Sequence, residues 1–339
     1  MTLTTAAVLG TGAWGTTFAQ VLADAGVTVT MWGRNADTIS FINGGENPTY
    51  LPGIALSERI SATTDIATAV AGRELVVVAV PVKAVRATLS AARESFAPDV
   101  ALLSLAKGLE LGSLKRVDEI IAEASGVPSS RIAVLSGPNL SREIAERQPT
   151  ATVVAATDVE LAKEIAKACH NSYFRPYAST DVVGTEMAGA TKNVIAVAIG
   201  AAEGMGLGTN TRSTLITRGL AEMTRLGTAL GADPATFAGL SGIGDLVATC
   251  SSRLSRNFSL GHRLGSGMGL AEALALSPGV VEGVASASPI LQVAASVGVD
   301  MPITGAVVEV VEGRASIEDM GRMLLARPQK MDGWKIELV

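Results

Sequence analysis

Residues 6–15 read AAVLGTGAWG, a short apolar run that ends in three glycines spaced as GxGxxG. The run predicts a buried strand, and the following TTFAQVLADA predicts a helix, so the glycines form a strand-to-helix turn. In that setting Gly10 permits the tight turn, Gly12 lets the backbone approach a pyrophosphate, and Gly15 lets the helix pack on the strand. The alternative is a glycine-rich turn without a ligand, but the βαβ setting favours dinucleotide binding, with the anion at the helix start.

Further short apolar runs follow this turn and alternate with helical stretches. Each run is almost wholly apolar, as strands that are covered on both faces usually are. The alternation predicts a doubly wound parallel sheet, or Rossmann fold, for the first half of the chain. The predicted strands are residues 6–9, 27–32, 75–80, 101–105, 132–135 and a weaker one around 153–154.

The pattern changes after Asp181. Residues 183–231 are rich in alanine and helical in period, and helical stretches recur as far as residue 323. We therefore expect two domains in an α/β chain. A dinucleotide-binding domain should span residues 1–181, and an all-helical substrate and catalytic domain should span residues 182–339.

Composition excludes several classes of protein. The chain has 339 residues, of which 48 % are hydrophobic and 17 % charged, so it can bury a large core and does not resemble a disordered chain. A net charge of −5 argues against a general nucleic-acid surface, because phosphate binding needs clustered Lys and Arg. Cys169 and Cys250 lie in no CxxC or Cys/His spacing, so we expect two buried thiols, no disulfide framework and no metal site.

The chain shows no targeting pattern. Its first residues, MTLTTAAVLG, lack the basic start and long apolar run of a secretory signal. We also expect no membrane span and a cytoplasmic protein. The sequence does not predict an oligomeric state, and a homodimer is compatible with it.

The end of the second predicted strand bears on cofactor choice. It reads Trp32–Gly33–Arg34–Asn35, without the Asp or Glu that binds the ribose diol in NAD-selective enzymes. A guanidinium at this place can bind a 2′-phosphate and stack on adenine. Arg34 thus predicts that NADPH is at least tolerated, and a solvated surface charge is the alternative.

Two lysines are the candidates for acid/base chemistry. A dehydrogenase that acts on an alcohol needs a group that exchanges the hydroxyl proton. Neither His170 nor His262 has a nearby acid to orient it, so both are interpreted as structural. Lys107 follows a predicted strand, and Lys192 lies inside a long apolar helix, where an ammonium group is costly unless it is paired or functional. The alternative for Lys192 is a side chain that extends to solvent.

Two loops could bind a phosphorylated ligand. Residues 239–257 read GLSGIGDLVATCSSRLSRN, which offers backbone N–H groups, hydroxyls and the guanidinium groups of Arg253 and Arg256. Asp245 in this stretch could hold Lys192 or accept a hydrogen bond from a substrate hydroxyl. The loop SGPNL brings Gly137 and Asn139 to the same crevice. A plain connector between helices is the alternative.

Six blocks in order resemble the bacterial NAD(P)-dependent glycerol-3-phosphate dehydrogenase family. They extend over residues 6–283, most of the chain, and are more specific together than GxGxxG alone. The blocks are GTGAWGTTFA, SLAKGLE, LSGPNLSREIA, KNVIAVAIG, LSGIGDLVATCSSRLSRN and GVVEG.

The resemblance implies reversible reduction of dihydroxyacetone phosphate to sn-glycerol 3-phosphate with NADPH or NADH, an entry to phospholipid synthesis. It implies that Lys192 is the general acid/base at the substrate C2 oxygen and that Lys107 contacts both substrate and nicotinamide. Arg256 would lie near the substrate phosphate and the cofactor. The implied substrate residues are Lys107, Gly137, Asn139, Asp245, Ser255, Arg256 and Asn257. The implied cofactor residues are Gly10, Gly12, Ala13, Trp14, Gly15, Arg34, Tyr50, Lys107, Ser141, Arg256, Val280 and Glu282.

Four positions depart from the family's usual residues. Asn139 stands where Ser is common, Leu140 where Phe is common, Ser141 where Ala is common, and Thr191 where Leu is usual. An Asn side chain still donates and accepts hydrogen bonds, so these changes bear on substrate preference and not on the reaction class.

Two other functions are compatible with the residues. A β-hydroxyacid or ketopantoate-type reductase has a similar architecture, but its substrate carries a carboxylate, whereas the 239–257 loop favours a phosphate. A non-catalytic NAD(P) sensor would have no reason to keep two lysines in costly settings. Turnover of a small ketone separates both from the family function.

Overall fold

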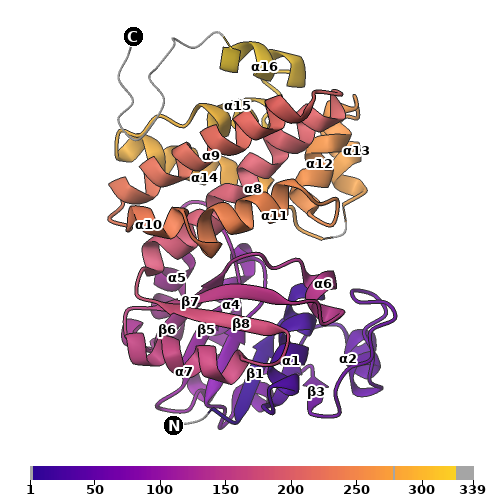
Figure 1. Cartoon of the computed structure of the whole chain (residues 1–339). Helices are drawn as coiled ribbons and strands as arrows, with labels where there is room; N and C mark the ends of the chain where they lie inside the picture. The colour runs from indigo at the N-terminus through magenta and orange to yellow at the C-terminus, as the bar shows by residue number, and fades with distance from the viewer. Residues whose placement is uncertain (1–2, 278, 326–339) are drawn as a thin grey trace.

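The computed structural model describes residues 3–277 and 279–325. An eight-stranded sheet with its helices forms one half of the molecule, and a helical half lies over it (Figure 1). The strand order is β3-β2-β1-β4-β5-β6-β7-β8. The strands are β1 (Thr5–Leu9), β2 (Thr28–Trp32), β3 (Ile60–Thr63), β4 (Leu75–Val78), β5 (Ala101–Ser104), β6 (Ile132–Ser136), β7 (Thr150–Ala156) and β8 (Phe174–Ser179).

The doubly wound α/β fold is confirmed, with differences at the sheet edges. All six predicted strands are present, and β4 and β5 are fully buried, which explains their continuous apolar runs. Of the seven strand pairings among the described residues, six are parallel, but β7 pairs with β6 in the antiparallel direction. The sequence analysis missed β3 and β8, because these edge strands are partly exposed and carry no apolar run.

The helices of the first half connect these strands. Helix α1 follows β1 directly, and the strand order changes direction between β1 and β4, which places a crevice at the carboxyl ends of these strands. The helices are α1 (Ala13–Asp24), α2 (Ala36–Asn43), α3 (Ile66–Val70), α4 (Val82–Ala92), η1 (Arg93–Ser95), α5 (Val117–Ser125), η2 (Ser129–Arg131), α6 (Ser141–Ala145) and α7 (Val159–Cys169).

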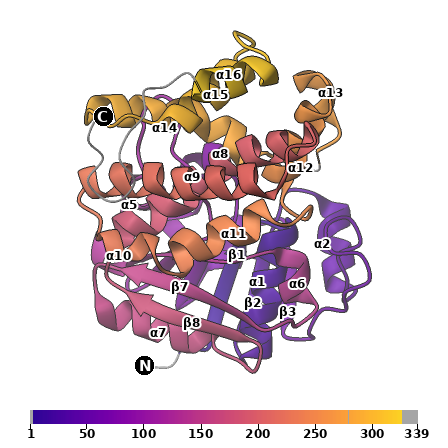
Figure 2. The same ribbon diagram turned by 45° about the horizontal axis from the view of Figure 1, so that its top comes forward.

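From Val182 onward the described chain is entirely helical, as predicted (Figure 2). The predicted domain bounds also reach residues 1 and 339, which lie outside the described residues. The helices are α8 (Val182–Gly204), α9 (Thr209–Ala229), α10 (Pro234–Phe237), the π-helix η3 (Leu240–Gly244), α11 (Asp245–Cys250), α12 (Arg256–Gly265), α13 (Leu270–Ala275), α14 (Glu282–Ser296), α15 (Pro302–Val311) and α16 (Ile317–Leu325).

Helix α8 is the core of the helical half. By length and composition this helix could cross a membrane. However, 94 % of its most apolar 18-residue stretch is buried inside the protein, as in the core helix of a folded domain. Helix α12 packs on it at very short range. A Cβ atom added to Gly200 would lie 2.1 Å from the carbonyl oxygen of Phe258, and one added to Gly261 would lie 2.0 Å from that of Val197. Glycine at these two positions therefore allows the backbones of α8 and α12 to approach this closely.

Polar contacts join the two halves. The Asp181 carboxylate accepts from Gly184 N at the start of α8 and from the Thr236 hydroxyl of α10. The Ser241 hydroxyl of η3 donates to the carbonyl oxygen of Ser136 at the end of β6, at 3.3 Å. The Ser241 bond holds η3 against the carboxyl end of β6, and the Asp181 bonds hold the start of α8 to α10.

The two cysteines are buried thiols, as predicted, and the structural role of the two histidines stays a prediction. Cys169 and Cys250 are both free and buried. His170 is the exposed C-cap of α7, and the His262 ring lies 3.1 Å from the exposed Arg253 guanidinium.

Candidate active site

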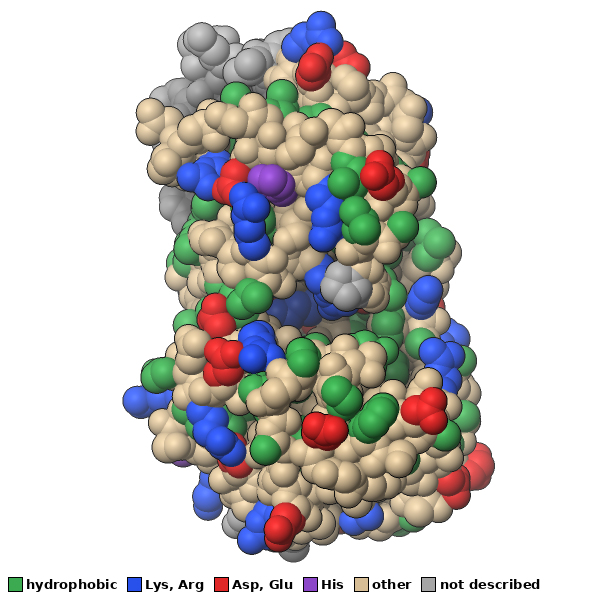
Figure 3. Space-filling view, turned by 90° about the vertical axis from the view of Figure 1, so that its right-hand side faces the viewer, with side chains coloured by type: hydrophobic (Ala, Val, Ile, Leu, Met, Phe, Trp, Pro, Cys, Tyr) green, Lys and Arg blue, Asp and Glu red, His purple; other side chains and the backbone are tan. Residues whose placement is uncertain are grey.

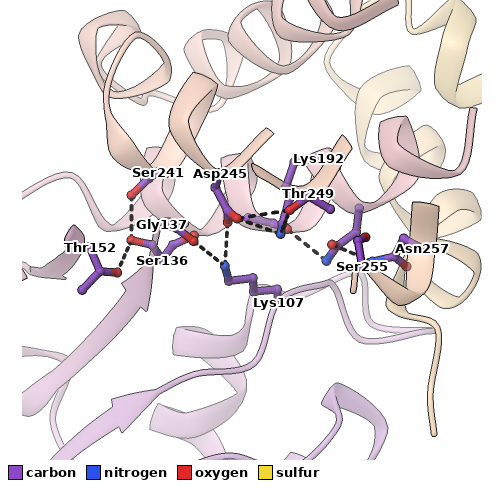
Figure 4. A network of polar contacts seen from close by, with 12 residues as sticks. Lys107, Ser136, Gly137, Thr152, Lys192, Ser241, Asp245, Thr249, Ser255 and Asn257 are labelled. Atoms are coloured by element: carbon purple, nitrogen blue, oxygen red, sulfur yellow. Dashed lines mark hydrogen bonds and ion pairs between the residues drawn. The ribbon is translucent and has the colours of Figure 1, made fainter. Parts of the chain in front are cut away.

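The two candidate lysines meet at one buried carboxylate, Asp245 (Figure 4). Lys107 lies three residues beyond the end of β5, Lys192 lies within α8, and Asp245 is the first residue of α11. The cleft between the two halves is visible as a hollow on one face of the molecule, with Lys or Arg side chains inside it (Figure 3). The carboxyl end of the sheet and the helical half therefore build this cluster jointly.

Both carboxylate oxygens of Asp245 are engaged. Lys107 Nζ donates to Oδ2 at 2.6 Å, and Lys192 Nζ donates to Oδ1 at 2.9 Å. Lys192 Nζ also donates to the Thr249 hydroxyl at 2.5 Å, and that hydroxyl lies 3.3 Å from Asp245 Oδ1. The Lys192 side chain is 9 % exposed, so it does not extend to solvent.

The cluster carries two positive charges and one negative charge out of water. Burial lowers the pKa of Lys107 to about 8; the Lys192 charge adds to this, and the Asp245 carboxylate opposes it. Burial alone would raise the pKa of Asp245, but the Lys107 and Lys192 ammonium groups outweigh that effect and hold it below its usual value. Asp245 thus stays ionised and balances one of the two cations.

The loop after β6 faces the same cluster. Gly137 has a φ of +150°, and its carbonyl oxygen accepts from Lys107 Nζ at 3.4 Å. A Cβ atom at this position would lie 2.8 Å from the Thr152 hydroxyl oxygen, so only glycine fits. Both amide atoms of Asn139 are buried without a hydrogen-bond partner among the described residues. Buried polar atoms are normally paired, so Asn139 fits a residue that binds a polar ligand.

A second polar chain runs from Lys192's neighbour to the start of α14. Asn257 Nδ2 donates to Asn193 Oδ1 at 2.8 Å, and Gly283 N donates to Asn257 Oδ1 at 2.9 Å. Ser255 caps α12 by accepting from Phe258 N at 3.2 Å, which leaves its hydroxyl hydrogen free to donate. The predicted substrate residues Ser255 and Asn257 are therefore buried and fixed.

The fingerprint turn has the shape that a dinucleotide needs. Gly10 has a φ of +126°, and a Cβ atom there would lie 2.6 Å from the Ala79 carbonyl oxygen. A Cβ atom at Gly15 would lie 2.3 Å from the Gly10 carbonyl oxygen, whereas one at Gly12 would meet nothing within 4 Å. Gly12 thus faces open space at the start of α1, where no side chain caps the helix. The buried Trp14 Nε1 has no partner among the described residues, so this end of the cleft fits a bound cofactor.

The other predicted cofactor residues are spread around the cleft. Arg34 and Tyr50 are exposed, on the segments that flank α2, and in the described residues neither side chain hydrogen-bonds to the lysine cluster. Ser141 begins α6, and its carbonyl oxygen accepts a hydrogen bond from the Thr17 hydroxyl of α1 at 3.2 Å.

Glu282, the first residue of α14, is the acidic residue among the predicted cofactor residues, and the half-buried Val280 lies two residues before it. Burial raises the pKa of Glu282 to about 7, and the Arg256 and Lys83 charges oppose that rise. Arg256 is exposed as the first residue of α12. Glu282 and Arg256 are thus close enough to interact although α12 and α14 are separate helices.

Two features were missed by the sequence analysis. Thr249 lies four residues after Asp245 on α11, and this i, i+4 spacing was the pattern that could have paired them.

The second feature is Glu186, on α8, which accepts from Arg116 Nε at 3.2 Å and from Asp118 N at 3.0 Å. Burial raises the pKa of Glu186 well above its usual value, and the Asp118 carboxylate adds to that rise. This contact ties α8 to α5, on the side of α8 away from Asp245.

Two family models match the chain. The model described as NAD-dependent glycerol-3-phosphate dehydrogenase N-terminus matches residues 5–162. The model described as NAD-dependent glycerol-3-phosphate dehydrogenase C-terminus matches residues 181–322.

Individual relatives agree with these models. A protein of Streptomyces griseus named glycerol-3-phosphate dehydrogenase [NAD(P)+] is 53 % identical over 96 % of this chain and 98 % of its own. A protein of the same name from Thermobifida fusca is 54 % identical over 90 % of this chain and 92 % of its own. The crystal structure of glycerol-3-phosphate dehydrogenase from Coxiella burnetii has a TM-score of 0.91 at 32 % identity, over 96 % of this chain and 99 % of that one. A ketopantoate reductase from Ralstonia eutropha, at 16 % identity and a TM-score of 0.58, shares the fold alone.

Proposed function

The chain belongs to the NAD-dependent glycerol-3-phosphate dehydrogenase family, and we propose that its cleft reversibly reduces dihydroxyacetone phosphate to sn-glycerol 3-phosphate. Its activity is that of an oxidoreductase that uses NADH or NADPH. The product is a precursor of glycerophospholipids. We place the enzyme in the cytoplasm, and we divide it after Asp181 into a cofactor domain and a substrate domain.

The observation that carries the proposal is one buried carboxylate between two buried ammonium groups. Asp245 holds both Lys107 and Lys192 within hydrogen-bond distance, at the carboxyl end of a sheet whose first turn fits a dinucleotide. Buried charges are costly, and such clusters are found mainly where a reaction needs them. A protein that only senses a dinucleotide has no need of this arrangement.

Lys192 is the proton donor in the proposed reduction. A reduced nicotinamide, when bound in the cleft, would supply the hydride for the carbonyl carbon of the ketone. As negative charge develops on the C2 oxygen, the Lys192 ammonium group donates a proton to it, and in the reverse direction the Lys192 amine accepts the proton. Asp245 and the Thr249 hydroxyl hold Nζ in one position, which keeps the proton aimed at the reacting oxygen.

The remaining polar groups bind the substrate. Lys107 and Asn139 face the reacting end of the ketone from the β5 and β6 loops, and Asn139 is proposed to use its two unpaired amide atoms there. The phosphate is placed at the start of α12, where Ser255 and the Arg256 guanidinium can bind it. Binding energy from this non-reacting phosphate orients the ketone for reaction.

The cofactor is assigned to the turn after β1. Its pyrophosphate would lie against Gly12 and the first N–H groups of α1, and Arg34 would contact the adenosine ribose or its 2′-phosphate. Glu282 and Arg256 belong to the helical half and would close on the cofactor from the other side of the cleft.

The test is consumption of NADPH or NADH, followed at the absorbance of the reduced nicotinamide, with three ketones side by side. We expect rapid oxidation with dihydroxyacetone phosphate, and little with unphosphorylated dihydroxyacetone or with ketopantoate. Equal rates with both dihydroxyacetones would remove the phosphate site from the proposal. Turnover of ketopantoate alone would replace the proposed substrate with a carboxylate, and no turnover of any ketone would favour a sensor.

A further inference from the structure

We propose that a pocket beside the substrate loop is a second binding site, for a small amine with an apolar chain or ring. The pocket has a volume of about 250 Å³ and is lined by residues of α6, η3, α11 and the start of β7. Both halves of the molecule contribute to its walls. These are Pro138 and Leu140 from the loop after β6, Glu143 from α6, residues 149–151 at the start of β7, Leu240 from η3 and Ala248 from α11.

The size of the pocket selects small ligands. An apolar cavity of ~150 Å³ is enough for benzene, and sites for drug-sized ligands occupy roughly 300–1,000 Å³. A pocket of about 250 Å³ therefore fits a ligand somewhat larger than benzene and excludes a nucleotide. The dinucleotide and the pocket's ligand consequently belong to different sites.

The charge of the pocket selects a cation. Glu143 is half-buried, and its carboxylate forms no ion pair or side-chain hydrogen bond with any described residue. The neighbouring arginines are engaged elsewhere: Arg142 binds Glu146 and the Pro52 carbonyl oxygen, and Arg147 binds Asp24. An ammonium group on Glu143 would supply the missing charge, while an apolar body would contact Pro138, Leu140 and Leu240.

The position of the pocket links it to the proposed substrate site. Pro138 and Leu140 are the two neighbours of Asn139, and Ala248 precedes Thr249, which binds Lys192. Leu240 precedes Ser241, which donates to the Ser136 carbonyl oxygen across the two halves. A ligand that packs between these residues favours one spacing of the halves, so its binding and substrate binding influence each other reciprocally.

The test compares three ligands of equal chain length, n-hexylammonium, 1-hexanol and hexanoate, by calorimetric titration of the full chain. We expect hexylammonium to bind about five-fold more tightly than hexanol, as for one partly exposed ion pair of ~1 kcal/mol, and hexanoate to bind most weakly. Glu143→Gln should bring the affinities of hexylammonium and hexanol together. The matched variant Glu146→Gln, on the same helix but paired with Arg142, should change neither.

Filling the pocket gives an independent check. Ala151→Leu adds bulk to the wall contributed by β7 and should weaken hexylammonium and hexanol alike, with folding verified by thermal unfolding. Equal affinity for hexanoate and hexylammonium, hexylammonium binding that Glu143→Gln leaves unchanged, or no binding of any ligand would each overturn the proposal. These titrations use no ketone, so their outcome is independent of the proposed enzymatic function. A shift of the ketone KM with hexylammonium, absent in Glu143→Gln, would then report the coupling.

Discussion

The turn after β1 and the lysine cluster, the proposed cofactor and proton-transfer sites, are built by opposite physical means. Between Gly10 and Gly15 the site is made of backbone, and its decisive feature is the absence of side chains. At Asp245 the site is made of charged side chains that are taken out of water and fixed to one another. The first site should therefore be sensitive to added atoms, and the second to lost charges.

The difference also separates binding from chemistry. A pyrophosphate held by N–H groups at a helix start is bound in the same way before and during a reaction. A proton held at Lys192 matters only as charge develops on the reacting oxygen. Changes at the turn should consequently alter cofactor affinity, and changes at the cluster should alter turnover.

The largest expected effect is that of Lys192→Ala. Loss of a positioned general acid typically costs about 10²- to 10⁴-fold, so kcat should fall by that amount. Steady-state kinetics with the phosphorylated ketone measure this, with Lys167→Ala, on the surface of α7, as the control that keeps full activity. A kcat within a few-fold of the parent's would assign the proton to another group.

A smaller effect is expected from Arg256→Ala. Hydrogen bonds to a charged group contribute about 1.5–3 kcal/mol, so the ketone KM should rise roughly 10- to 100-fold, with a smaller change in kcat. Arg253→Ala removes an exposed arginine of the preceding loop that already pairs with Glu203, and it should leave KM nearly unchanged. If both variants behave alike, the phosphate is not bound at the start of α12.

The two glycine variants of the turn should differ in kind. Gly15→Ala forces a Cβ atom to 2.3 Å from the Gly10 carbonyl oxygen, so the free energy of unfolding should fall by about 1–3 kcal/mol. Gly12→Ala meets nothing in the protein and should leave that free energy unchanged, while its Cβ atom occupies the approach to the pyrophosphate and weakens cofactor binding. Chemical denaturation and cofactor titration measure the two effects. A Gly12→Ala variant that binds the cofactor normally would show that the pyrophosphate lies elsewhere.

The smallest predicted effect is a shift of the pH profile. Below pH of about 8 Lys107 is cationic, and above it the amine is neutral, so kcat/KM should decline as the pH rises through that value. The Asp245 charge raises the pKa of Lys107, so Asp245→Asn should move this decline to lower pH in addition to reducing the rate. Asp158→Asn, a change at the exposed N-cap of α7, should leave the profile in place. A decline that moves to higher pH in Asp245→Asn would contradict the assignment.

The sequence predicted those parts of the molecule in which a local pattern decides the structure. The GxGxxG spacing and the apolar runs of β1, β4 and β5 depend on residues close together in the chain. The edge strands β3 and β8 were not predicted, because they are partly exposed and carry no apolar run. The antiparallel direction of β7 could not be predicted from its residues either, because the path of the connecting chain determines the direction of a strand.

Within the site, residue types were predictable and partners were not. A lysine in the apolar α8 indicated function, and Asp245 was predicted either to hold it or to accept a hydrogen bond from a substrate hydroxyl. That Lys107 shares the same carboxylate depends on a contact between residues 138 positions apart, which only the folded chain defines. The unpaired atoms of Asn139 and the pocket beside Glu143 likewise exist only in three dimensions.

The most direct test of the contrast between the two regions is a titration of NADPH into Gly12→Ala and Lys192→Ala, paired with kcat at saturating cofactor. We predict that Gly12→Ala binds NADPH weakly yet keeps most of its kcat, and that Lys192→Ala binds NADPH like the parent protein yet has almost no turnover. If Lys192→Ala loses NADPH affinity and Gly12→Ala keeps it, the assignment of cofactor binding to the turn and of proton transfer to the cluster is wrong.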